Sequence, residues 1–249
     1  MKAMILAAGL GTRLRPLTND RPKALVTVAG RTMLEICLTR LRQFGVDEVI
    51  VNTHHYAEMI REFLEANNNF EMRIEISHEE ELLDTGGGLK KAAWFFLEGK
   101  DPEDPSLAPF ILHNVDIIST IDIAGMVQAH KESGALATIA GQDRETKRYL
   151  LYDEQGVLCG RRHGRDGELK LVRPAMSPHA LAYSCIQVIE PRIFEEMTET
   201  GAFSIIDAEL RMVSQGARIL SFRDDRAYWR DLGRPESVEM AAKEAAAGF

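Results

Sequence analysis

The sequence predicts an α/β protein in three layers, with a mostly parallel central sheet between two layers of helices. Two observations support this fold class. Short apolar strands alternate with helical patterns over residues 1–140, which is the rhythm of a parallel sheet covered on both faces. After Gly141 the rhythm changes to paired strands, which predicts a smaller α+β region added to the sheet.

The first half of the chain is expected to hold five strands and four helices. Residues 1–6 form a short apolar run, which predicts a buried strand. Over residues 32–44, Leu34, Leu38 and Leu41 recur at helical spacing, and Gly45 marks the helix end. The other expected strands are 48–52, 73–77, 110–112 and 136–140, and the other expected helices are 56–66, 88–97 and 121–131.

The second half is expected to begin with paired strands at 149–152 and 157–161, around the turn Asp153-Glu154-Gln155-Gly156. A long strand follows at 180–189, and a further strand is expected at 218–222. Helices are expected at 193–197, 205–214 and 235–246. At 249 residues the chain suits a single domain, 1–249, with parts 1–140 and 141–249.

Composition limits the partners. The chain carries a formal net charge of −8, with 45% hydrophobic and 27% charged residues. An acidic globular protein of this kind argues against nucleic-acid binding and against binding to anionic membranes. No apolar stretch is long enough to cross a bilayer. Three scattered cysteines (Cys37, Cys159 and Cys185) show no metal spacing, so we expect reduced thiols and a cytoplasmic protein.

The loop after the first strand concentrates small residues and cations. Glycine tolerates the positive φ that lets N–H groups converge, and small residues let the backbone approach a ligand closely. Arginine can fork onto phosphate oxygens, and lysine adds a point charge. The loop therefore predicts a polyphosphate site. Its small residues are Ala7, Ala8, Gly9 and Gly11, and its cations are Arg13, Arg15, Arg21 and Lys23, against the single acid Asp20.

Other interpretations of this loop are weaker. A dinucleotide-binding Gly-x-Gly-x-x-Gly would need a third glycine where Leu14 stands. A P-loop would end in Gly-Lys-Ser/Thr, which is absent. A purely structural turn remains an alternative, although so many cations are costly for a mere turn.

The same residues resemble a known family signature. Leu-Ala-Ala-Gly-x-Gly-Thr-Arg-Leu-x-Pro-x-Thr runs from Leu6 to Thr18, and Pro-Lys-x-Leu follows at 22–25. This pattern is similar to that of the sugar-1-phosphate nucleotidyltransferases. The resemblance implies the Rossmann-like nucleotide-diphospho-sugar transferase fold, with a nucleotide-binding part at 1–140 and a sugar-binding part at 141–249. It implies a nucleoside triphosphate and a sugar 1-phosphate as substrates.

The resemblance also implies a catalytic set. Arg13 corresponds to the arginine that contacts the triphosphate, and Lys23 to the lysine that reaches the reacting phosphates. Asp116 follows a central strand, at the edge where open α/β sheets place ligands. Asp231 lies in a late Trp-x-Asp-x-Gly-x-Pro-Glu, and an N-cap of the last helix is its alternative role. Asp116 and Asp231 are the expected ligands of Mg²⁺, which prefers a few carboxylates plus phosphate oxygens and water.

A glycine cluster, Thr85-Gly86-Gly87-Gly88, precedes the helix expected at 88–97 and leaves backbone N–H groups to meet a ligand. A plain flexible start of a helix is the alternative. With the family signature it completes the expected nucleotide-binding set: Leu6, Ala7, Ala8, Gly9, Gly11, Thr12, Arg13, Thr85, Gly86 and Gly87.

On the sugar side the sequence departs from the family pattern. Asn114 and Asp207 are candidate sugar-binding residues, and Val115 is bulkier than the usual Gly or Ala and is expected to narrow the pocket. Val172-Arg173-Pro174 replaces a common Glu-Lys-Pro, and Cys185 lies in a strand where many relatives have glycine. The basic stretch at 161–173 is equally consistent with phosphate contact and with a solvated hairpin.

Within the family, the short chain and the Thr-Gly-Gly segment most resemble N-acetylmuramate-1-phosphate uridylyltransferases or mannose- or heptose-1-phosphate guanylyltransferases. Uridylyl transfer from UTP is favoured over guanylyl transfer from GTP. A non-catalytic nucleotide-sugar-binding relative is the alternative, disfavoured because Arg13, Lys23, Asp116 and Asp231 are all present. The base, the sugar and the oligomeric state stay open.

Overall fold

Four parallel strands form one half of the central sheet in the computed structural model, which describes residues 1–246. Their order across the sheet is β5 (Arg73–His78), β4 (Glu48–Thr53), β1 (Lys2–Leu6) and β6 (Phe110–Asn114). Leu6 lies beside Asn52 on one side and Asn114 on the other, so these strands end in one row. The expected parallel sheet is confirmed.

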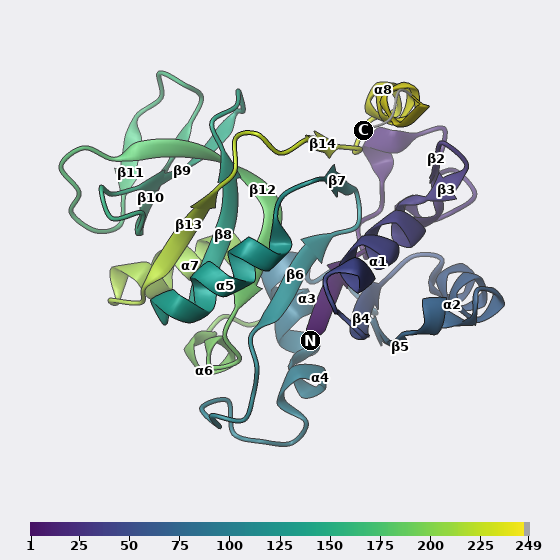
Figure 1. The fold of residues 1–249 in the computed structure, drawn as a ribbon, viewed down its shortest axis with the longest axis horizontal. Coiled ribbons are helices and arrows are strands. Elements are labelled where there is room, and N and C mark those ends of the chain that lie inside the picture. The colour runs from purple at the N-terminus through teal and green to yellow at the C-terminus, as the bar shows by residue number, and fades with distance from the viewer. Residues whose placement is uncertain (247–249) are drawn as a thin grey trace.

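Beyond β6 the sheet becomes largely antiparallel. The long strand β12 (His179–Ile189) pairs antiparallel with β6, and with both β8 (Ala137–Gln142) and β9 (Arg148–Tyr152). The sheet continues through β10 (Leu158–His163) to β11 (Leu169–Leu171), while β13 (Ile219–Arg223) runs parallel to β8. The expected change of architecture after Gly141 is confirmed (Figure 1).

Alternating side chains of the strands build a separate core on each face. In β1, Ala3 and Ile5 point into one core, and Met4 and Leu6 point into the other. The first core includes residues of α1 (Met33–Gln43), α2 (Ala57–Ala66), α5 (Ile123–Ser133) and α8 (Pro235–Ala246). The second includes residues of α3 (Asp84–Lys91), α4 (Ala93–Leu97), α6 (Ile193–Glu196) and α7 (Ile205–Ser214), so the three-layer prediction is confirmed (Figure 1). Within residues 1–246, no helix has both the length and the apolar character needed to cross a membrane.

Five short strands were not expected from the sequence: β11 at the edge of the main sheet, and four that form two small pairs. β2 (Thr27–Val28) and β3 (Arg31–Thr32) form one small pair, and β7 (Ile117–Ser119) and β14 (Trp229–Asp231) form another. In the second pair Asp231 lies opposite Ile117, and the Leu232 N–H donates to the Asp116 carbonyl at 2.8 Å. This pairing brings a late segment of the chain to the end of β6 (Figure 1).

The helix expected at 88–97 begins earlier and is divided. α3 starts at Asp84 and ends at Lys91, and α4 follows from Ala93. The three glycines therefore lie inside α3 and are buried. A Cβ on Gly86 would lie 2.4 Å from the Phe203 ring, and one on Gly87 would lie 2.4 Å from the Gly201 carbonyl oxygen. The glycines thus serve close packing of α3 against residues 201–203, and a flexible start of the helix is not what the structure shows.

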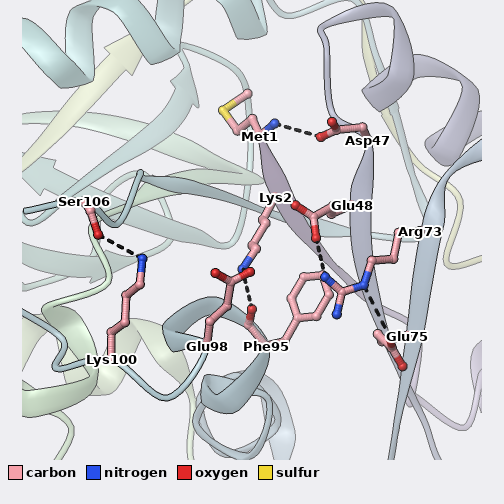
Figure 2. Close-up of polar contacts among 10 residues, drawn as sticks. All are labelled: Met1, Lys2, Asp47, Glu48, Arg73, Glu75, Phe95, Glu98, Lys100 and Ser106. Carbon is pink, nitrogen blue, oxygen red and sulfur yellow. Dashed lines mark hydrogen bonds and ion pairs between the residues drawn. The ribbon is translucent and has the colours of Figure 1, made fainter. Parts of the chain in front are cut away.

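The amino-terminal edge of the parallel strands is a surface of mutually paired charges. Its ion pairs involve exposed or partly exposed side chains, and such pairs typically contribute at most about 1 kcal/mol each. The Lys2 ammonium also donates to the Phe95 carbonyl at 2.7 Å. The pairs are Met1–Asp47, Lys2–Glu98 and Arg73–Glu48 (Figure 2). Because these cations already have acidic partners, this edge offers little to an anionic ligand.

Candidate active site

The glycine-rich loop is anchored by an asparagine on the neighbouring strand. The Asn52 Oδ1 accepts the N–H groups of Ala7, at 2.6 Å, and Ala8, at 3.3 Å. The Asn52 Nδ2 donates to the buried Glu79 carboxylate at 2.7 Å, and the other Glu79 oxygen accepts the Leu83 N–H at 3.0 Å. The Ala7 and Ala8 donors are therefore engaged within the protein. Sequence reasoning gave Asn52 and Glu79 no role, although a polar residue ending a buried strand was a usable signal.

Two glycines in the loop make room for Lys23. Gly11 has a φ of 63°, in the left-handed region that favours glycine. A Cβ at Gly11 would lie 3.0 Å from the Thr18 side chain and 3.2 Å from the Lys23 Cβ, and one at Gly9 would lie 3.4 Å from the Lys23 Nζ. The Lys23 side chain thus passes close beside the loop, while Thr12 and Arg13 remain exposed.

Lys23 reaches the end of strand β6. Its Nζ lies 3.1 Å from the Asp116 Oδ2, and both side chains are only about one-eighth exposed (12% and 13%). A lysine and an aspartate so far from each other in sequence thus form a largely buried ion pair at the carboxyl edge of the sheet.

Asp231 joins this group through β14. Its Oδ1 accepts the Gly233 N–H at 2.6 Å, so the carboxylate closes a turn before α8 and does not cap that helix. A Cβ on Gly233 would lie 2.8 Å from the Asp231 Oδ1 and 2.9 Å from the Arg13 Nη2. The structure therefore gathers all four expected catalytic side chains at one edge. They are Arg13, Lys23, Asp116 and Asp231.

Asp116 and Asp231 offer hard oxygen donors on adjoining segments, which fits a divalent cation completed by phosphate oxygens and water. No cluster of three or more His, Cys, Asp or Glu side chains arranged to hold a metal occurs within residues 1–246. The donor set is therefore limited to the two aspartates, as magnesium chemistry allows.

Beside these residues lies a cavity of about 1170 Å³, lined by both halves of the chain. Of the expected site residues, Thr85, Asn114, Asp207 and Asp231 line it. Asp207, at the start of α7, is ion-paired with Arg161. Val115 does not line it, because its side chain is buried in the core and its N–H donates to the Leu6 carbonyl. The expectation that Val115 narrows the pocket is wrong.

Much of the basic stretch faces this cavity. The lining cations are Arg144, Arg148, Arg161, Arg162 and Lys170, with His163, against the acids Asp84, Glu168, Asp207 and Asp231. Arg173 is not among them, because its Nη1 donates to the Asp153 Oδ2 at 2.6 Å. Hence Arg173 has a structural contact, whereas its neighbours on β10 and β11 face the cavity.

The backbone N–H groups of Gly86 and Gly87 have acceptors within the protein, contrary to expectation. The Gly86 and Gly87 N–H groups both donate to the Phe203 carbonyl, at 2.9 and 3.3 Å. The Thr85 Oγ1 accepts the Ile205 N–H at 3.0 Å. The expectation of free N–H donors at Gly86 and Gly87 is therefore wrong, and these hydrogen bonds tie α3 to Phe203 and to the first residue of α7.

Cys185 lies in a bulge of β12, where the register with β8 shifts between Tyr183 and Gln187. Its φ of 59° lies in the left-handed region, which explains why glycine suits this position in relatives. Burial, with the nearby charges of Asp116 and Asp231, raises the pKa of the Cys185 thiol to about 12. The thiol therefore stays protonated in the cavity wall at neutral pH.

Residues 2–151 match the Nucleotidyl transferase family. The chain belongs to this family. Another nucleotidyl transferase, the N-acetylmuramate alpha-1-phosphate uridylyltransferase of Caulobacter vibrioides, is 44% identical over 250 residues, covering 97% of this chain and 95% of that protein. Mannose-1-phosphate guanylyltransferase 1 of Arabidopsis thaliana is 39% identical over 140 residues, covering 56% of this chain and 37% of that protein. The family expectation is confirmed.

Solved structures of low sequence identity share the fold. HddC from Yersinia pseudotuberculosis, complexed with GMP-PN, has a TM-score of 0.74 at 22% identity, with 98% of this chain and 99% of that chain covered. The UDP-glucose pyrophosphorylase from Acinetobacter baumanii has a TM-score of 0.76 at 18% identity, with 98% and 92% covered. The expected fold class is confirmed.

Proposed function

We propose that this nucleotidyl transferase transfers a uridylyl group from UTP to N-acetylmuramate 1-phosphate. A phosphate oxygen of the sugar 1-phosphate attacks the α-phosphorus of UTP and forms the new P–O bond. The bond from the α-phosphorus to the oxygen that bridges to the β-phosphorus breaks, and pyrophosphate leaves with the electron pair. The product is the UDP-sugar, and the attacking oxygen needs no proton removed.

The observation that carries the proposal is the charge cluster at the carboxyl edge of the sheet. Lys23 and Asp116 form a largely buried pair there, and the Arg13 guanidinium lies against Gly233, next to Asp231. Both substrates are anions, so catalysis of nucleotidyl transfer depends on charge neutralisation and in-line positioning. The cluster supplies cations where the two phosphates must meet.

The two parts of the chain are proposed to divide the substrates. Residues 1–140 hold the nucleotide, with Gly9, Gly11, Thr12 and Arg13 at the triphosphate and 85–87 nearer the base and ribose. Residues 141–249 hold the sugar, with Asp207, and with Asn114 contributed from β6. Support comes from the cavity, which is lined by Thr85 on one side and by Asp207 on the other.

Asp116 and Asp231 are the proposed Mg²⁺ ligands. The ion would supply positive charge at the α-phosphate when bound. Lys23 keeps Asp116 in place by its ion pair, and the Gly233 N–H fixes one oxygen of Asp231. This arrangement leaves the other oxygen of each carboxylate for the cation.

The choice of UTP and of N-acetylmuramate rests on the Caulobacter vibrioides relative, which matches nearly the whole chain. The basic wall of the cavity is consistent with an acidic sugar. A cytoplasmic location belongs to the same proposal, in keeping with the three unpaired cysteines.

Pyrophosphate release from UTP, GTP and other triphosphates, each paired with several sugar 1-phosphates, tests this function. We expect turnover with UTP and N-acetylmuramate 1-phosphate that is lost when a chelator removes Mg²⁺. Asp116→Ala and Asp231→Ala should each lower kcat by at least a hundredfold, while Asp47→Ala, at the opposite edge, should not. Nucleotide-sugar binding without turnover for any pair would favour the non-catalytic alternative instead.

A further inference from the structure

Three arginines of the cavity wall, Arg144, Arg148 and Arg162, make no ion pair within residues 1–246, and Arg144 is the one that lies against Trp229. Arg144 lines the cavity from the segment between β8 and β9 and makes no ion pair with any residue in 1–246. Two other cations of the site are already engaged, since Lys23 pairs with Asp116 and Arg161 with Asp207. Arg144 is therefore a free positive charge at this end of the site.

The Arg144 side chain is held rigidly. Its guanidinium carbon lies 3.4 Å from the centre of the Trp229 ring, in a stacked cation–π contact. Its Nη2 donates to the Tyr183 carbonyl at 2.7 Å, and the Trp229 Nε1 donates to the Ser184 carbonyl at 2.8 Å. The guanidinium and the ring beneath it are thus both tied to β12. The N–H groups on Nε and Nη1 of the guanidinium donate to no residue within 1–246.

This position is next to Asp231. Trp229 and Asp231 are two positions apart on β14, so their side chains point to the same face of the strand, about 7 Å apart along it. Because Arg144 stacks on Trp229, its positive charge lies near the Asp231 carboxylate, the next side chain on that face. Other lining cations, such as Arg162 and Lys170, lie on the β10–β11 hairpin, with β9 between them and β12.

The surroundings of Arg144 are unfavourable for an unneutralised charge. The residue is half-buried, and its Nε is buried without a hydrogen-bond partner. Burial lowers the pKa of the guanidinium from its ordinary value, and the nearby Cys185 and Asp231 oppose this effect. A partly desolvated cation is normally kept where it pairs with an anion, and here the protein supplies none in direct contact.

We propose that Arg144 binds the phosphate of the sugar 1-phosphate. This inference rests on the proposed function and names a substrate-binding residue that the family signature does not include. The Nη1 group and the second N–H of Nη2 match two oxygens of a phosphate in the bidentate manner typical of arginine. Stacking on Trp229 fixes the plane of the fork, which leaves the third phosphate oxygen free to face the α-phosphorus of UTP.

A carboxylate on the sugar offers the same chemistry as the phosphate, because both are oxyanions that a guanidinium can fork onto. The phosphate is favoured because the reacting phosphates must lie at Asp231, and Arg144, like Arg13, is an unpaired cation adjoining it. The two sources can be separated with N-acetylglucosamine 1-phosphate, which has the phosphate but no carboxylate.

The test compares Arg144→Ala, Arg144→Lys and the wild type in steady-state kinetics, with each substrate varied in turn. Loss of a charged, bidentate contact predicts a rise of about 10- to 100-fold in KM for the sugar 1-phosphate. The rise should be similar for N-acetylmuramate 1-phosphate and for N-acetylglucosamine 1-phosphate if the latter turns over. The KM for UTP should change less than about twofold, and Arg144→Lys should recover part of the loss. Arg192→Ala, an exposed arginine that donates to the Gly134 carbonyl outside this cavity, is the matched control and should behave as wild type.

Three results would overturn the proposal. They are an unchanged KM for the sugar 1-phosphate, a loss confined to N-acetylmuramate 1-phosphate, and an equal loss for UTP and the sugar. The second would assign Arg144 to the sugar carboxylate. Equilibrium binding of N-acetylmuramate 1-phosphate and N-acetylglucosamine 1-phosphate, measured by calorimetry, separates this inference from the proposed function. If the wild type turns over no pair yet binds both sugars, and Arg144→Ala binds neither, only the function fails.

Discussion

A buried glutamate beneath the cavity predicts how stability depends on pH. Glu209 lies on α7, whose first residues line the cavity, and its side chain is fully buried. Its Oε2 accepts a long hydrogen bond from the Gln187 Nε2 at 3.4 Å, and its Oε1 has no hydrogen-bond partner within residues 1–246. The phenols of Tyr152 and Tyr183 are the nearby titratable groups, and burial raises the pKa of each well above the ordinary value, so both stay neutral.

Burial raises the pKa of Glu209 from 4.5 to about 8. Between these values the folded protein holds a proton that the unfolded chain has lost. The free energy of unfolding should therefore fall as pH rises, by about 1.36 kcal/mol per pH unit from this group. The loss at pH 7 is roughly 3 kcal/mol, and it levels off near 5 kcal/mol above pH 8.

Glu209→Gln removes this titration while keeping the size and the amide-like contact with Gln187. Urea unfolding at pH 5, 6, 7 and 8 should show the variant close to wild type at pH 5 and more stable by roughly 3 kcal/mol at pH 7. Glu62→Gln, on the exposed side of α2, controls for the loss of a surface charge. A difference between variant and wild type that does not grow with pH would refute the reasoning.

Three further substitutions probe the site. Asn52→Ala removes the acceptor of two loop N–H groups, so the KM for UTP should rise about tenfold in initial-rate measurements, with the KM for the sugar 1-phosphate unchanged. Gly233→Ala would place a methyl group 2.9 Å from the Arg13 guanidinium, so kcat should fall about tenfold while the melting temperature stays within a few degrees of wild type. Gly86→Ala would force a methyl group against Phe203 and should lower the unfolding free energy by about 1–3 kcal/mol in urea, with partial recovery in a double variant that also carries Phe203→Leu. An unchanged urea midpoint for Gly86→Ala would contradict the packing role of the glycine.

Strands β1, β4 and β6 were predictable because each contains a short apolar run between helical patterns, and β5 because Ile74 and Ile76 alternate with polar residues. β1, buried on both faces, contributes alternately to two cores, which requires apolar residues at nearly every position. The boundaries of α3 were not predictable, since three consecutive glycines disfavour a helix in isolation. Only the tertiary contact with Phe203 shows that α3 has no room for a side chain at these glycines.

β7 and β14 were missed because three-residue strands carry almost no periodic signal. Their pairing is set by tertiary contacts, including the hydrogen bond from Leu232 to the Asp116 carbonyl. The proximity of the candidate catalytic residues was nevertheless predicted, since Lys23, Asp116 and Asp231 each lie in a recognisable motif, and the structure brings them together. Arg144 lies in no such motif, and only its stacking on Trp229 draws attention to it.

The β7–β14 pairing has a consequence for the order of synthesis. Asp116 and Asp231 are separated by 115 positions in the chain (231 minus 116), yet adjoin through this small sheet. During translation the parallel strands, with the phosphate loop and Asp116, leave the ribosome long before β14 does. A nascent chain can therefore form the parallel framework early, but Asp116 and Asp231 come together only after β14 has emerged and docked.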